Sequence, residues 1–75
     1  MTNNIEFGRI IKCYRKSARL SREKCAKLCN ISESYMGDIE RGESQPRFTV
    51  VADLCNVCDI DISVLYRLYH PDGEP

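Results

Sequence analysis

The feature that most constrains this sequence is a very short connection between two helical segments near its middle. Cys29 ends one apolar helical pattern, and Ser32 is a good N-cap for the next. Only Asn30 and Ile31 lie between them, and asparagine tolerates the left-handed conformation that ends many helices. So short a link makes two helices cross steeply, which predicts a helix-turn-helix unit over about residues 21–41.

Apolar residues recur with helical spacing along the rest of the chain, and no segment has the alternation expected of a strand. The spacing predicts helices over residues 5–17 and 48–58, a helix capped by Ser21, one capped by Ser32, and a fifth capped by Asp61. The fold class expected is therefore all-α, a compact five-helix bundle. The apolar stripes are Phe7, Ile10, Ile11 and Tyr14; Cys25, Leu28 and Cys29; Met36 and Ile39; Val51, Leu54, Cys55 and Cys58; and Ile62, Leu65, Tyr66 and Tyr69.

Seventy-five residues are enough for one domain, which we expect over residues 1–70 with a flexible C-terminal tail at 71–75. The sequence has no signal-peptide pattern at its start and no apolar run of the ~20 residues that a membrane span needs. We therefore expect a cytoplasmic protein without a membrane partner.

The charges are unevenly distributed although the net charge is zero. Residues 1–31 hold eight basic and two acidic side chains, a net +6, and residues 32–75 hold three basic and nine acidic ones, a net −6. This asymmetry favours a basic face for an anionic partner. A solvated helix face that binds nothing would give the same pattern.

Two stretches carry a family resemblance: Leu-Ser-Arg-Glu-Lys-Cys-Ala at 20–26, and Ile-Ser-Glu-Ser-Tyr-Met-Gly-Asp-Ile-Glu-Arg-Gly at 31–42. With Pro46-Arg47-Phe48, they resemble the phage repressor/Cro (XRE) family over about residues 7–68. The resemblance implies a DNA-binding transcriptional regulator without enzymatic activity. It also implies a structural ion pair between Arg15 and Glu40, whose bidentate geometry would fix the third helix.

The resemblance further implies which residues contact duplex DNA. Phosphate contacts fall at the start of the second helix and around the end of the third, and base contacts fall on the outer face of the third helix. The expected phosphate contacts are Ser21, Arg22, Arg41, Ser44, Gln45 and Arg47. The expected base contacts are Ser32, Glu33, Ser34, Gly37 and Asp38.

Two of these positions depart from the family, which commonly has Gln, Arg, Thr or Lys where this chain has Glu33 and Asp38. A carboxylate can accept a hydrogen bond from cytosine, so acidic base contacts are possible. Alternatively, Glu33 only stabilises the helix dipole and Asp38 pairs with Arg41 one turn on.

Five cysteines are unusual in so short a chain, and Cys55 and Cys58 have the spacing of a metal or redox motif. Because most of them fall on apolar stripes, we favour reduced core residues and expect no cofactor. A redox sensor and a zinc site are the alternatives, and Cys13 is expected at the surface. The zinc site would use Cys25, Cys29, Cys55 and Cys58.

The function predicted is sequence-specific binding of double-stranded DNA, most simply as a repressor with its third helix in the major groove. No nucleophile–base pair or phosphate-binding glycine loop indicates an enzyme or a small-molecule substrate. A homodimer is expected through Leu65, Leu68 and Tyr69, unless these residues close the core. The alternative functions are a protein–protein interaction module without DNA binding and a thiol- or metal-responsive regulator.

Overall fold

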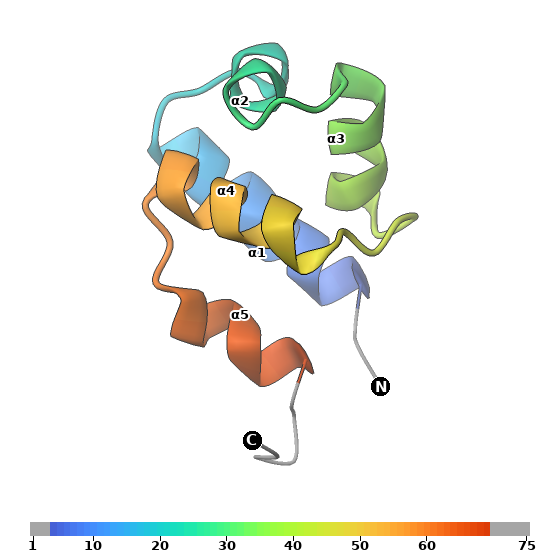
Figure 1. The fold of residues 1–75 in the computed structure, drawn as a ribbon, viewed down its shortest axis with the longest axis vertical. Coiled ribbons are helices and arrows are strands. Elements are labelled where there is room, and N and C mark those ends of the chain that lie inside the picture. Colours follow the sequence, from blue (N-terminus) through green and yellow to red (C-terminus); the bar gives the residue numbers. More distant parts are fainter. Residues whose placement is uncertain (1–3, 70–75) are drawn as a thin grey trace.

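The computed structural model describes the backbone of residues 4–69 and the side chains of residues 4–66. This part of the chain forms five helices and no strand, so the predicted all-α, five-helix fold is confirmed (Figure 1). The helices are α1 (Asn4–Ser17), α2 (Arg22–Leu28), α3 (Glu33–Arg41), α4 (Phe48–Cys58) and α5 (Ile62–Tyr69).

The helix α1 lies at the centre of the arrangement and packs against α3 and α4, while α2 packs against α3 and α4. In Figure 1, α2 is seen almost end-on whereas α3 runs down the view, so the two helices cross steeply as the short connection predicted. The helix α5 lies at the opposite end of the molecule from α2 and α3. The helix-turn-helix unit therefore forms one end of the fold.

The predicted N-caps are confirmed by hydrogen bonds. The hydroxyls of Ser21 and Ser32 each accept a hydrogen bond of 3.0 Å from the backbone N–H three residues on. The Asp61 carboxylate accepts one of 3.0 Å from the N–H of Ser63, and this bond lowers the pKa of Asp61. These side chains satisfy N–H groups that a helix start leaves unpaired, and so they fix where α2, α3 and α5 begin.

Four helices end at a residue with a left-handed backbone. Gly42 (φ 78°), Asn30 (φ 59°) and Asp59 (φ 57°) are residue types that tolerate this conformation, while Arg19 (φ 62°) adopts it without such a preference. At Asn30, its own N–H and that of Ile31 donate to carbonyls of α2, at 3.1 and 3.0 Å. This paired bonding closes α2 within the few residues available before α3 begins.

Among the side chains that the structure describes, thirteen apolar ones form the core, and they come from all five helices, the end of α2 and the α4–α5 connection. Three residues of the predicted apolar stripes are exposed: Leu28 (53%), Ile62 (42%) and Tyr66 (45%). Two more, Ile10 and Tyr14, are only partly buried against the core. The helices α2 and α5 are short, and only one narrow side of each faces the core. Helical spacing alone therefore assigned too many of their apolar residues to the core. The core residues are Phe7, Ile11, Cys25, Ala26, Cys29, Met36, Ile39, Val51, Leu54, Cys55, Cys58, Ile60 and Leu65.

The crossing of α1 and α3 depends on Gly8. A Cβ atom at this position would clash with the backbone carbonyl oxygen of Ile39 and lie 2.6 Å from that of Glu40. Backbone atoms cannot move aside as a flexible side chain can, so any larger residue would push α3 away from α1.

Replacing Gly8 by alanine is therefore expected to destabilise the fold by about 1–3 kcal/mol, despite the higher helix propensity of alanine. The matched control is Gly37→Ala in α3, where the added Cβ would meet only the guanidinium end of Arg41. That substitution should be neutral or stabilising by up to about 1 kcal/mol. Urea unfolding followed by circular dichroism measures both, and equal effects would refute the close approach.

Candidate nucleic-acid interface

A buried ion pair joins α1 to α3. The Arg15 guanidinium donates to the Glu40 carboxylate from Nε at 2.6 Å and from Nη2 at 3.2 Å. The two side chains are only 8% and 2% exposed. The hydrogen bond to Glu40 raises the pKa of Arg15, although burial opposes the shift. The geometry is the bidentate one that the family resemblance implied.

The same guanidinium also holds the loop between α1 and α2. Nη1 of Arg15 donates to the carbonyl of Leu20 at 2.8 Å. Nε of Arg22 lies 3.5 Å from Oε1 of Glu40, the oxygen that also accepts from Nη2 of Arg15, and it is buried without a hydrogen bond. The ion pair and its two neighbours thus connect α1, the start of α2 and the end of α3, and they fix the orientation of the helix-turn-helix unit.

The start of α2 presents two of the predicted phosphate contacts. Ser21 is exposed, and its hydroxyl is used as the N-cap. Arg22 keeps 39% of its side chain exposed even though its Nε points toward Glu40. Its role in the ion-pair network was not predicted from the sequence, because Arg22 and Glu40 lie on different helices.

The outer face of α3 is exposed at its start and partly buried further along the helix. Ser32, Glu33 and Ser34 at its start are exposed, and Asp38 is half-buried. Gly37 is buried, and the Arg41 guanidinium lies 2.9 Å from where its Cβ would be. The base contact at Gly37 stays a prediction, and it would require the Arg41 side chain, which lies over this glycine, to move.

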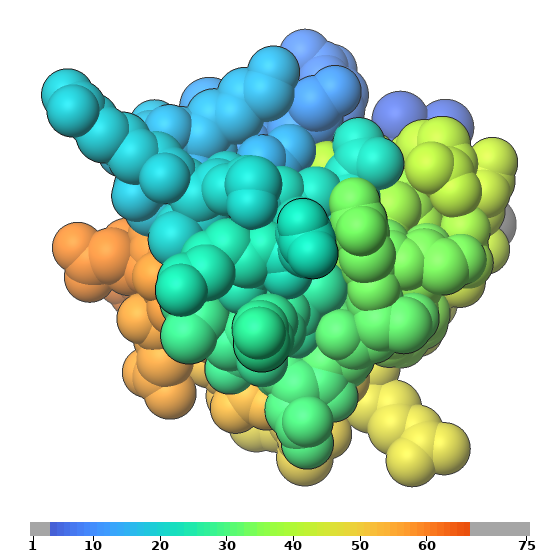
Figure 2. All heavy atoms as spheres, turned by 90° about the horizontal axis from the view of Figure 1, so that it is seen from above, coloured from blue at the N-terminus to red at the C-terminus, as the bar shows by residue number. Residues whose placement is uncertain are grey.

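Between the start of α2 and α3 the surface is hollowed, at the end of the molecule that Figure 2 faces. Two arginines, one acid, a serine and the glycine line this hollow. Its polar lining and its place beside a helix start suit an anionic or hydrogen-bonding ligand. The lining residues are Arg22, Glu33, Ser34, Gly37 and Arg41.

Arg41 is held by two carboxylates. Its Nη2 lies 2.7 Å from Asp38 and its Nε 3.2 Å from Glu43, while 52% of its side chain remains exposed. A phosphate contact by Arg41 would compete with these partners. The Asp38 pairing is the alternative that helical spacing had allowed, and the Glu43 pairing was not foreseen.

The segment that follows α3 holds the remaining predicted phosphate contacts. Gln45 and Arg47 are exposed, Ser44 is half-buried, and Pro46 between them is buried. Arg47 occupies the N-cap position of α4 without a capping hydrogen bond from its side chain.

The cysteines divide as expected between core and surface: Cys13 is exposed and the other four are buried and reduced. In the part of the chain that the structure describes, no three His, Cys, Asp or Glu side chains are arranged to hold a metal ion. The zinc site considered from the sequence is therefore not assembled among these residues.

The predicted dimer contact needs one correction. Leu65 has no exposed surface and is part of the core, so it cannot meet a second chain without unfolding α5. The side chains of Leu68 and Tyr69, which completed this prediction, lie outside the described residues.

A steeply crossed α2–α3 pair with a polar, exposed outer helix start defines a helix-turn-helix protein. Residues 6–68 match the family model described as "Helix-turn-helix domain", and the chain belongs to this family. The resemblance to phage repressors that the sequence carried is confirmed.

The chain is similar to a bacterial protein and to two phage proteins. It is 36% identical over 59 residues to the "Uncharacterized HTH-type transcriptional regulator YazB" of Bacillus subtilis (strain 168), covering 79% of this chain and 86% of the relative. Two proteins of Bacillus phage phi105 also match. The "ImmF control region 10 kDa protein" is 29% identical (87% of this chain, 72% of the relative), and the "Immunity repressor protein" is 31% identical (77% and 40%).

These findings identify the chain as a DNA-binding transcriptional regulator, from a family whose members typically have no enzymatic activity. Among the described residues, no helix is long and apolar enough to cross a membrane.

Removing the carboxylate of the buried Arg15–Glu40 pair should strongly destabilise the fold. The substitution Glu40→Ala leaves the buried Arg15 guanidinium without its partner, and we expect a loss of about 3–5 kcal/mol in the free energy of unfolding. The control is Asp38→Ala on the same helix, which removes an exposed ion pair and should cost less than about 1 kcal/mol. Chemical denaturation of both variants tests this, and the interpretation fails if the two losses are alike.

Proposed function

We propose that this protein is a sequence-specific repressor that binds double-stranded DNA with α3 in the major groove. The observation that carries the proposal is the orientation of α3, whose exposed start stands beside the start of α2 and is held there by the buried Arg15–Glu40 pair. Occlusion of a promoter is its simplest mode of action, with no enzymatic step and in the cytoplasm. The relative named as an immunity repressor supports the repressor role.

On this proposal, DNA is contacted in two ways. The phosphate backbone of the DNA is contacted by the N–H groups and side chains of Ser21 and Arg22 at the start of α2. It is also contacted by the loop from Ser44 through Gln45 to Arg47. Arg41 joins these contacts by exchanging the Asp38 and Glu43 carboxylates for a phosphate. Such an exchange gives up two ion pairs for one, but both are solvent-exposed pairs, each of which contributes at most about 1 kcal/mol.

Base pairs are contacted by the exposed residues at the start of α3, namely Ser32, Glu33 and Ser34. The Glu33 carboxylate has only acceptors, so it selects a base that presents a donor in the major groove, such as cytosine N4. Asp38 is half-buried and paired with Arg41, which makes it a base contact only when Arg41 turns to a phosphate.

The proposed assembly is a homodimer on a two-fold operator, because one such small domain covers little DNA. Since Leu65 is in the core, the dimer contact must use other residues. Sedimentation with and without an operator would give the number of chains bound.

The proposal predicts a specific salt dependence. Replacing Arg47 by alanine should weaken binding to all duplexes alike, and it should reduce the slope of log K against log salt by about 0.9, because one phosphate contact is lost. The control is Arg9→Ala on α1, an exposed arginine paired with Glu6, which removes the same charge outside the proposed interface. Fluorescence anisotropy between low and moderate salt measures both slopes.

If the Arg9 variant changes the slope as much as the Arg47 variant does, binding is a diffuse charge effect and the proposed interface is wrong. If no duplex binds even at low salt, the chain is a protein–protein interaction module, the alternative that the acidic Glu33 and Asp38 had suggested.

A further inference from the structure

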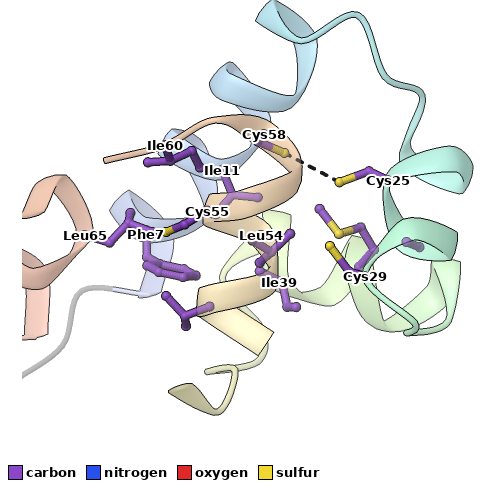
Figure 3. Packing of buried hydrophobic residues seen from close by; sticks show 13 residues of the cluster. Phe7, Ile11, Cys25, Cys29, Ile39, Leu54, Cys55, Cys58, Ile60 and Leu65 are labelled. Carbon is purple, nitrogen blue, oxygen red and sulfur yellow. Dashed lines mark hydrogen bonds between the residues drawn. The ribbon is translucent and has the colours of Figure 1, made fainter. Parts of the chain in front are cut away.

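Two buried thiols from different helices meet in the core. Sγ of Cys25 in α2 lies 3.7 Å from Sγ of Cys58 at the end of α4, and the two side chains point toward one another (Figure 3). They are 33 residues apart in the sequence, and their side chains belong to residues that are 0% and 3% exposed. DNA binding as proposed above gives this contact no role.

We propose that Cys25 and Cys58 are a disulfide-forming pair, a site at which a hydroperoxide oxidant reversibly links α2 to α4. A disulfide requires the two sulfurs to approach to about 2.05 Å, which is a small movement from direct contact. The link would tie the first helix of the helix-turn-helix unit to the body of the fold.

Other pairings are less favourable. Cys29 is the C-cap of α2, one turn after Cys25, and Cys55 precedes Cys58 by one turn within α4. Residues one turn apart have Cβ atoms about 5–6 Å apart. A disulfide needs about 3.5–4.5 Å, so either link would distort its helix. Cys25 and Cys58 face one another from two different helices, so a disulfide between them distorts neither helix in this way.

The surroundings favour Cys25 as the thiol that reacts first. A hydrogen bond from Cys58 lowers the pKa of Cys25, and the nearby Arg15 guanidinium acts in the same direction against the effect of burial. The same contact raises the pKa of Cys58, which keeps its proton. Burial means that both thiols react only during local opening of the α2–α4 contact, so oxidation should be slow.

The reaction balances with one peroxide per pair. The Cys25 thiolate attacks a peroxide oxygen, the O–O bond breaks, and a sulfenic acid and hydroxide form; the hydroxide takes the proton that Cys25 released. The Cys58 sulfur then attacks the sulfenic sulfur, the S–S bond forms, and the hydroxyl leaves as water with the Cys58 proton. Two electrons pass from the two thiols to the peroxide, and a dithiol reductant reverses the link.

The test is to treat the natural, folded chain at low protein concentration with hydrogen peroxide, alkylate the remaining thiols, and map the tryptic peptides by mass spectrometry. Trypsin separates Cys25 (residues 25–27) from Cys29 (residues 28–41), and fragmentation of the 48–67 peptide distinguishes Cys55 from Cys58. We expect loss of the Cys25 and Cys58 thiols and one linked peptide pair, restored by dithiothreitol. The exposed Cys13 reports that the oxidant has acted.

Two cysteine variants test whether the cross-link requires Cys25 in particular. Cys25→Ala should abolish the cross-link, whereas the control Cys29→Ala, which removes a buried thiol at the end of the same helix, should keep it. The proposal is overturned if Cys13 is oxidised while Cys25 and Cys58 both remain free, or if Cys25 links to any other cysteine. The mapping needs no DNA, so its outcome is independent of the proposed repressor function.

Discussion

The arrangement of this protein depends on one buried ion pair, between Arg15 and Glu40. A charge taken out of water is costly unless it is paired and its other hydrogen-bonding groups are satisfied. Here the guanidinium makes two bonds to the carboxylate and a third to the Leu20 carbonyl. The pair therefore has one favourable geometry, and that geometry determines where α3 ends relative to α1 and the start of α2.

This constraint explains how a small core can present an exposed helix. The helix α3 packs only its Met36 and Ile39 side into the core, and its N-terminal turn stands at the surface. Apolar packing alone is non-directional and would allow α3 to rotate. The bidentate pair at one end and the Gly8 crossing near it remove that freedom, so the exposed serines and Glu33 keep a defined direction for recognition.

Much of the fold could be predicted from the sequence because its signals are local. The caps Ser21, Ser32 and Asp61 and the short link through Asn30 depend on residues within one turn of each other. The site was less predictable, because its interactions join distant residues. Spacing could not reveal that Arg22 lies beside Glu40 or that Cys25 meets Cys58. It also left open whether Leu65 forms a dimer contact or closes the core, and in the structure this residue closes the core. The resemblance to phage repressors supplied the Arg15–Glu40 pair, which periodicity alone could not.

The central claim is that the exposed start of α3 contacts base pairs. Selection of the purified protein against a randomised duplex pool at low salt, followed by sequencing, tests it most directly. The account predicts enrichment of a two-fold motif, with a change of preference at one position in each half-site when Glu33 is replaced by glutamine. If nothing is enriched, or if the motif is the same with and without the Glu33 carboxylate, the assignment of α3 as the base-contacting helix through this residue is contradicted.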